Sequence, residues 1–341
     1  LWAILAEQGL LGIAVPEAAG GTGLGLTELC IVLEEQGARV APVPLYSSLV
    51  LGGLPIAEFG NQEQQQRWLA ALAAGTSRFS AAIADVGLNP AVASTVEAVA
   101  EGDNWVLNGH KAMVPDGGAA NFVLVPVRDE QGRESFFVVD TSAAGVSITP
   151  VEIGISGQRA AHLDLAGVRV GSDALLGSIG QGQEILDWLE QHANIGHCAL
   201  QVGVTESAMR RTAEYLGERQ QFGVPLGSFQ ALAMRMADSY IDVESIRTTY
   251  WLALWRLTQG LDARAEIRAA KWFACDAAHR VVSTAQHLHG GMGADIEYPI
   301  HRFFLMAKQI SYSLGNATNQ LEKLGALLAS DDSLGFRALE A

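Results

Sequence analysis

Two short segments combine residue types that suit a phosphate-bearing ligand. The first spans residues 219–226 (Arg-Gln-Gln-Phe-Gly-Val-Pro-Leu) and is followed by Phe229-Gln230, and the second spans residues 286–293 (Gln-His-Leu-His-Gly-Gly-Met-Gly). Arginine offers a planar, permanently charged fork that can hold a pyrophosphate, an aromatic ring can lie against an adenosine, and glycine lets backbone approach a ligand closely. The alternatives are an exposed helix arginine and a glycine helix cap. The candidate ligand-binding residues are Arg219, Phe222, Gln230, Gln286, Gly290 and Gly291.

A glycine cluster near the amino end resembles a nucleotide-binding loop only superficially. Gly20, Gly21, Gly23 and Gly25 follow closely on one another, but Leu26 stands where a GxGxxG motif needs its last glycine. No strand-to-helix pattern surrounds the cluster, as that motif would require. We therefore interpret the cluster as a loop rather than a phosphate cradle.

Histidines and tryptophans in the second half also have simple interpretations. His279, His287 and His289 lie close in sequence, but no cysteine or carboxylate completes a zinc pattern beside them. Trp251 and Trp255 are four residues apart, on one face of a predicted helix. We expect them to be core residues rather than a ligand platform.

Composition bounds the possible functions. The chain has 341 residues, of which 49% are hydrophobic and 17% charged, which indicates a globular protein with large cores and excludes a disordered chain. It carries 22 Lys and Arg against 37 Asp and Glu, a net charge of −15. This balance argues against nucleic acid as the main partner, because binding phosphate backbones needs a basic face.

Cysteine usage and hydropathy indicate a cytoplasmic protein. Three cysteines, Cys30, Cys198 and Cys275, are too few for a disulfide framework and predict a reducing compartment. No apolar run reaches the length of a membrane span, so we expect none, and no signal peptide is recognised.

The hydrophobic period divides the chain into three predicted domains, 1–79, 80–175 and 176–341. In the first, helices are expected over 28–35 and 61–74, with Gln62, Gln64 and Gln65 exposed and Trp68, Leu69 and Leu72 inward. In the second, the period is two, and strands are expected near 105–109, 121–127, 135–139, 145–151 and 162–170, with a hairpin turn at 129–133. In the third, helices are expected over 184–219, 228–259, 263–288 and 316–330.

These elements predict an α+β, multi-domain fold. An N-terminal helical domain precedes a middle antiparallel β-sandwich or barrel, because many short strands have no helices between them. Four long helices with short connections then form a C-terminal bundle. A glycine-rich stretch at 177–182 joins the last two domains.

Segments 219–230 and 286–299, the latter ending Glu297-Tyr298-Pro299, together resemble the acyl-CoA dehydrogenase family, as does the stretch 2–25. The resemblance covers nearly the whole chain in the right order. It implies FAD as cofactor. It also implies that the candidate residues above grip the ADP half of an FAD whose flavin ring lies in the neighbouring subunit, and that an electron-transfer flavoprotein accepts the electrons.

The carboxylate that the family uses as its base is missing from both places where members carry it. The family removes a proton beside the thioester and passes a hydride to the flavin, which needs a positioned base. Alignment without gaps puts one base position at Leu314 and the other at Ala193. Neither side chain can take a proton. Glu190, three residues before Ala193, is the best substitute.

Residues that line the flavin ring in the family are altered as well. The family's Thr-Glu-Pro segment corresponds to residues 84–90 here, which read Ala-Asp-Val-Gly-Leu-Asn-Pro. The aromatic residue and threonine expected after Gly-x-Lys are replaced by the stretch Met113, Val114 and Pro115. An expected Arg-Asp pair is Leu305-Met306, and an expected threonine is Asn316.

The pattern of losses favours a non-catalytic subunit of a heteromeric acyl-CoA dehydrogenase. Residues for this chain's own flavin ring are gone, whereas those for a neighbour's ADP half remain. We expect an α2β2 assembly with a catalytic partner that holds most of the acyl-CoA, resembling actinobacterial enzymes that shorten sterol side chains. The alternatives are a self-sufficient homo-oligomer that uses Glu190 and a scaffold without flavin chemistry.

Overall fold

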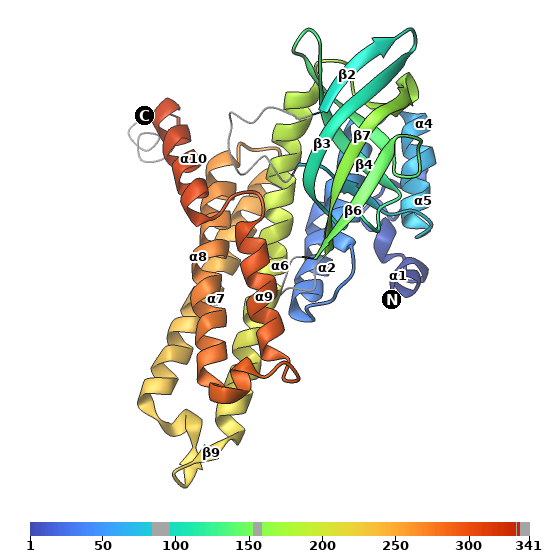
Figure 1. Cartoon of the computed structure of the whole chain (residues 1–341). Helices are drawn as coiled ribbons and strands as arrows, with labels where there is room; N and C mark the ends of the chain where they lie inside the picture. Colours follow the sequence, from blue (N-terminus) through green and yellow to red (C-terminus); the bar gives the residue numbers. More distant parts are fainter. Residues whose placement is uncertain (84–95, 153–158, 332, 335–341) are drawn as a thin grey trace. The chain divides into compact units, whose positions relative to one another are not determined.

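The computed structural model describes residues 1–83, 96–152, 159–331 and 333–334. These form two compact units. One comprises Leu1–Leu29 with Pro42–Ala193, and the other comprises Cys30–Ala41 with Asn194–Ala341. Figure 1 shows helices at both ends of the chain and strands in its middle, so the predicted fold class is confirmed.

Short helices make up the start of the first unit. They are α1 (Trp2–Glu7), the first residues of α2 (Leu26–Ala38), a π-helix (Tyr46–Gly53), α3 (Leu54–Phe59), α4 (Gln62–Gln64), a second π-helical turn (Gln65–Leu69) and α5 (Ala70–Ala73). Asn61 starts α4 with a capping box, because its side chain accepts from the backbone of Gln64 while the Gln64 side chain accepts from the backbone of Asn61. Trp68, Leu69 and Leu72 are buried as expected.

Gln64 is buried, so the expectation that it would be exposed is wrong. Its Nε2 donates to the carbonyl oxygens of Asp173, at 2.9 Å, and Leu175, at 2.7 Å. These bonds satisfy the amide of a buried polar side chain. They also fasten this helical turn to the segment that follows the last long strand.

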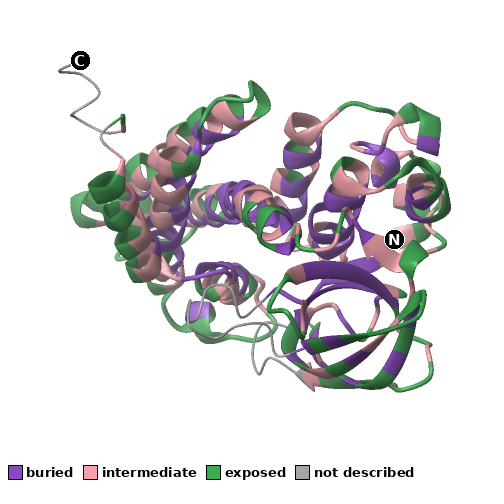
Figure 2. Cartoon of the chain, turned by 90° about the horizontal axis from the view of Figure 1, so that it is seen from above, coloured by how far each residue is buried: buried purple, intermediate pink, exposed green. Residues whose placement is uncertain are grey.

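The middle of the chain forms one eight-stranded sheet. Its strands are β1 (Phe79–Ala81), β2 (Val96–Glu101), β3 (Asn104–Pro115), β4 (Phe122–Asp129), β5 (Glu134–Asp140), β6 (Val146–Glu152), β7 (Arg159–Gly171) and β8 (Leu175–Leu176). The order is β6-β7-β3-β2-β4-β5-β8, and β1 also pairs with β4. Figure 2 shows both buried and exposed stretches on the strands. Buried and exposed residues alternate at the start of β2, because every second side chain faces the core, whereas β4 and β5 are each buried over five consecutive residues.

The predicted antiparallel pairing holds for most of the sheet but not for all of it. The β4–β5 hairpin is antiparallel, with Val123 opposite Val139, and its turn lies at the predicted place. However, β1 and β2 both pair with β4 in parallel. The sheet is therefore mixed, because the strands on either side of residues 84–95 run in the same direction as β4.

The second unit is a helical bundle. It contains the later parts of α2 and α6 (Gly182–Glu218), together with α7 (Gln230–Thr258), α8 (Arg264–Leu288), α9 (Ile300–Tyr312) and α10 (Ala317–Ser330). The four predicted long helices are present, and α9 is an additional helix that was not predicted. Within this unit, α2 and α6 approach through glycine, since a Cβ at Gly203 would collide with the carbonyl oxygen of Glu34.

Candidate functional site

The first candidate segment forms an exposed hairpin between α6 and α7. Strands β9 (Gln220–Gln221) and β10 (Val224–Pro225) pair across a two-residue turn in which Phe222 and Gly223 have φ of 54° and 81°. Positive φ at both positions is typical of a tight hairpin turn. Phe222 is 92% exposed and contacts Phe229 edge-on, with ring centroids 6.2 Å apart. Its flat face is therefore open to a ligand.

Arg219 and Gln230 lie at the two ends of this hairpin. Arg219 follows the last residue of α6, and its backbone N–H donates to the carbonyl of Tyr215 at 2.8 Å. Gln230 is the first residue of α7. Both residues are exposed. The guanidinium and the amide can therefore reach a ligand without rearrangement of the fold.

The second candidate segment forms a turn between α8 and α9. A 3₁₀ helix, Gly290–Ala294, follows α8, and Gly290 has φ of 59°, which favours glycine. At Gly290 and at Gly291 a Cβ would meet no atom of the described residues within 4 Å. Gln286 stabilises the turn, because its Nε2 donates a hydrogen bond to the carbonyl of Gly293 at 3.0 Å. That donor is thus already used within the chain.

Aromatic stacking brings the two segments to the same end of the bundle. The ring of Tyr215, one turn before Arg219, stacks on His289 with centroids 4.4 Å apart, and His289 also contacts Tyr298 at 5.2 Å. His289 Nδ1 donates to the Ala285 carbonyl at 2.7 Å, and burial lowers the pKa of this histidine. Sequence reasoning considered His289 only as a possible metal ligand and missed this role.

Neither expected base position carries a titratable group. Leu314 is buried with φ of 57°, and its carbonyl accepts from Gln320 Nε2 at 2.9 Å. Ala193 is buried, and its carbonyl accepts from the Tyr46 hydroxyl at 3.2 Å. Glu190 lies partly exposed on α6. Both places where the family carries its carboxylate are thus filled by apolar side chains.

The end of β3, where the family's aromatic residue and threonine would stand, is irregular and held by hydroxyl groups. A bulge lies between Lys111 and Val114. Ser47 Oγ donates to Asp116 Oδ2 at 2.6 Å, and Ser80 Oγ donates to the Pro115 carbonyl at 2.5 Å. Burial raises the pKa of Asp116. Hydroxyl groups of the chain itself therefore form hydrogen bonds with the Asp116 carboxyl group and the Pro115 carbonyl at this end of β3.

Three other altered places remain, of which two have a structural environment in the described residues and one lies outside them. Asn316 Oδ1 accepts from the Asn319 backbone at 3.1 Å and so caps α10. Met306 is buried in α9, beside the partly buried Leu305. The altered stretch 84–90 lies outside the described residues.

The glycine loop near the amino end is unsuited to phosphate binding, as expected. Its amides donate to carbonyls of its own neighbourhood, including Gly21 to Pro16, Gly23 to Val15 and Leu24 to Ile13. The structure also contains no group of three His, Cys, Asp or Glu that could hold a metal, as far as its described residues extend.

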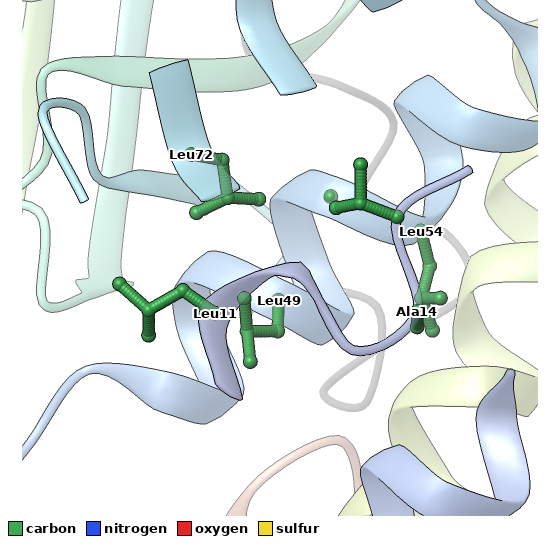
Figure 3. A pocket seen from close by; sticks show the side chains of 7 residues that line it. Leu11, Ala14, Leu49, Leu54 and Leu72 are labelled. Carbon is green, nitrogen blue, oxygen red and sulfur yellow. The ribbon is translucent and has the colours of Figure 1, made fainter. Parts of the chain in front are cut away.

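A small pocket in the same region is lined only by apolar residues and glycine (Figure 3). It encloses about 200 Å³, including space open to solvent, and is lined by Leu11, Ala14, Val15, Leu49, Gly53, Leu54 and Leu72. Ligand pockets are larger and carry some polar groups that fix orientation. We therefore attach no binding role to this pocket.

Comparison with known proteins accounts for these features. Models of the N-terminal, middle and C-terminal domains of acyl-CoA dehydrogenase match residues 1–76, 82–168 and 180–328. Acyl-CoA dehydrogenase FadE27 of Mycobacterium tuberculosis is 36% identical over 96% of this chain and 88% of its own. This chain belongs to the acyl-CoA dehydrogenase family. Members of the family are FAD flavoproteins, as was predicted for this chain.

Solved structures of family members show the same fold. A steroid acyl-CoA dehydrogenase variant, Tcur3481-Tcur3483 G363A, is 43% identical, with a TM-score of 0.87 and coverage of 96% of this chain and 88% of that one. The ChsE4-ChsE5 complex of Mycobacterium tuberculosis is 36% identical, with a TM-score of 0.89 and coverage of 97% and 88%. Among the described residues of this chain, no helix has the length and apolar character needed to span a membrane.

Proposed function

We propose that this chain is a non-catalytic subunit of a heteromeric acyl-CoA dehydrogenase and completes the FAD site of a catalytic partner. One contrast carries the proposal. Residues suited to the ADP half of FAD lie exposed at one end of the bundle, whereas both base positions, Leu314 and Ala193, are apolar and buried.

The exposed end of the bundle fits the ADP half of FAD. Arg219 would hold the pyrophosphate, because a guanidinium pairs with two phosphate oxygens at once. Phe222 would lie against the adenine, and the open backbone at Gly290 and Gly291 would admit close approach. Gln230 would supply a neutral hydrogen bond. Bound FAD supplies the acceptor for the electrons removed from the acyl-CoA.

The catalytic half of the site would come from the partner. Removal of the proton beside the thioester needs a carboxylate, and Leu314 and Ala193 have no group that can take a proton. This chain would therefore bind and orient the adenosine end of the cofactor, while the partner's carboxylate moves the proton. Acyl-CoA would likewise lie mainly in the partner.

The names of two structural relatives support the finer parts of the proposal. One is described as a steroid acyl-CoA dehydrogenase and the other as a complex of two differently named chains. We therefore propose a steroid-type acyl-CoA as substrate, an α2β2 assembly, and an electron-transfer flavoprotein as electron acceptor, in the cytoplasm. The division at 1–79, 80–175 and 176–341 stays a prediction.

Co-expression with a catalytic chain tests the proposal. We expect a mixed tetramer with half an FAD per chain, as measured by absorbance together with the mass of the complex. Glu190→Gln should leave the turnover of this complex unchanged, and the matching exchange at exposed Glu63 provides the control. One FAD per chain, or a yellow, active oligomer of this chain alone, would overturn the proposal and favour Glu190 as base.

A further inference from the structure

Lysine is scarce in this chain, and only part of it is within reach of solvent. The lysines are Lys111, Lys271, Lys308 and Lys323. Lys111 and Lys271 are buried, with 3% and 0% of their surface exposed. Lys308 on α9 and Lys323 on α10 are partly exposed. A reagent in solution can therefore reach two lysine side chains, which can be compared within one molecule.

Lys308 contacts a histidine instead of an acid. Its Nζ lies 3.4 Å from Nε2 of His279 on α8, and 5.6 Å from the ring centre of Phe304 on its own helix. Burial lowers the pKa of this amine, and no carboxylate of the described residues pairs with it to hold it in the charged form. A partly desolvated lysine without an acidic partner gives up its proton more readily than an ordinary one.

The contact fixes where His279 carries its proton. A charged lysine amine can only donate, so His279 Nε2 must accept the hydrogen bond. The proton of the imidazole then sits on Nδ1, which lies 3.3 Å from Ser283 Oγ and can donate to it. Burial and the neighbouring Lys308 lower the pKa of His279. The imidazole is therefore neutral near pH 7 and presents an electron pair to the amine.

The other charges near His279 oppose one another. Asp276 raises its pKa and Arg280 lowers it, both from α8 itself. Arg280 also forms ion pairs with Asp276 and with Asp242 of α7, where Nη2 and Oδ1 are 2.6 Å apart. Lys308 on α9 thus remains the charged group in direct contact with the imidazole, within the part of the chain that the structure describes.

Lys308, His279 and Ser283 have the arrangement of a nucleophile, its base and a group that orients the base. We propose that Lys308 is a site of covalent acylation by acyl thioesters, with His279 as the base. The neutral amine attacks the thioester carbonyl carbon, so that a C–N bond forms and the C–S bond breaks. His279 takes the proton that the nitrogen loses and passes it to the departing thiolate. The products are an amide and a free thiol, with no change of oxidation state.

The acyl donor belongs to a chemical class that this family already handles. Acyl-CoA dehydrogenases act on acyl-CoA thioesters, and the chain belongs to that family. The proposed acylation needs neither a flavin nor a partner chain. Its test is therefore independent of the proposed function, and each of the two can fail while the other holds.

Mass spectrometry of the full chain after incubation with acetyl-CoA tests the proposal, with Lys323 as the internal reference. At pH 7 we expect acetylation of Lys308 to be about tenfold faster than that of Lys323, a modest share of what a general base can provide. Above about pH 10 both amines are largely neutral, so this ratio should fall to the value that exposure alone sets. The same ratio at both pH values would overturn the proposal.

His279→Gln tests the base. Glutamine can still accept a hydrogen bond from Lys308 but cannot take up its proton, so acetylation of Lys308 should slow about tenfold, while Lys323 reacts as before. The matched control is His287→Gln, at an exposed position two turns further along α8. Thermal melts check that both variants are folded. Equal labelling of Lys308 in wild type and His279→Gln, or an ester on Ser283 that hydroxylamine removes, would refute the assignment.

Discussion

The imidazole of His289 stacks on the phenol ring of Tyr215, with 4.4 Å between centroids and 24° between planes. His289 belongs to the second of the two segments that would hold the ADP half of FAD, and Tyr215 lies one helical turn before the first. Tyr215→Leu would keep apolar bulk but remove the stack, so we expect a loss of about 1 kcal/mol in the free energy of unfolding. Denaturant melts measure it, and Tyr240→Leu, at an exposed tyrosine, should change little.

Arg219 should contribute to FAD retention rather than to folding. A hydrogen bond to a charged group contributes about 1.5–3 kcal/mol, so we expect Arg219→Ala to weaken FAD binding in the complex roughly 10- to 100-fold at unchanged melting temperature. Fluorescence titration of the apo-complex measures this affinity. Arg39→Ala removes another exposed arginine and is the control. Equal FAD affinity in both variants would contradict the assignment.

Gly291→Ala tests whether FAD lies close to this backbone without changing the stability of the chain. A Cβ at Gly291 meets no atom of the described chain within 4 Å, so the melting temperature should stay the same. If FAD lies against this backbone, the added methyl group should still reduce the FAD content of the complex. Gly217→Ala, in an equally open place on α6, should leave FAD content unchanged and raise stability by up to about 1 kcal/mol.

Gly203→Ala should strongly destabilise the bundle. The new Cβ would collide with the backbone oxygen of Glu34 on α2, and helix backbones cannot shift without repacking their side chains. We expect a loss of about 1–3 kcal/mol, read from chemical denaturation. Behaviour like that of Gly217→Ala would mean that α2 and α6 do not approach this closely.

His192 should make the free energy of unfolding depend on pH below neutrality. Burial lowers its pKa from 6.5 to about 4, and its ring stacks on Trp188. The unfolded chain therefore takes up the proton first, so folded stability should fall as pH drops from about 6.5 to about 4, by up to about 3 kcal/mol. His192→Phe should remove this part of the pH dependence. Parallel stability curves for variant and wild type would refute it.

Helices and hairpins of this fold could be predicted because the spacing of their hydrophobic residues is visible within a short stretch of sequence. The hairpin at 129–133 and the helices over 184–219 and 263–288 follow from spacing alone. Helix α9 was not predicted, although with 13 residues it is only one residue shorter than α10, which was. The parallel pairing of β1 with β4 could not be predicted, because it depends on residues distant in sequence.

The candidate site was predictable only in part. Arg219 and Phe222 were found because their residue types suit a ligand and because the segments resemble a family. The stack of His289 on Tyr215 requires two helices to meet, which no local pattern reveals. Trp255 was expected to be a core residue, but it is 54% exposed, because its four-residue spacing from Trp251 fits an exposed helix face as well as a buried one.

The turn at Leu314 keeps its shape without help from the side chain at that position. Gln320 holds its carbonyl, Asn316 caps the next helix, and Gly315 completes the left-handed bend with φ of 91°. A lineage could therefore exchange an acidic residue for leucine at this position and leave the scaffold intact. Division of labour between two diverging gene copies would then need no redesign of the architecture.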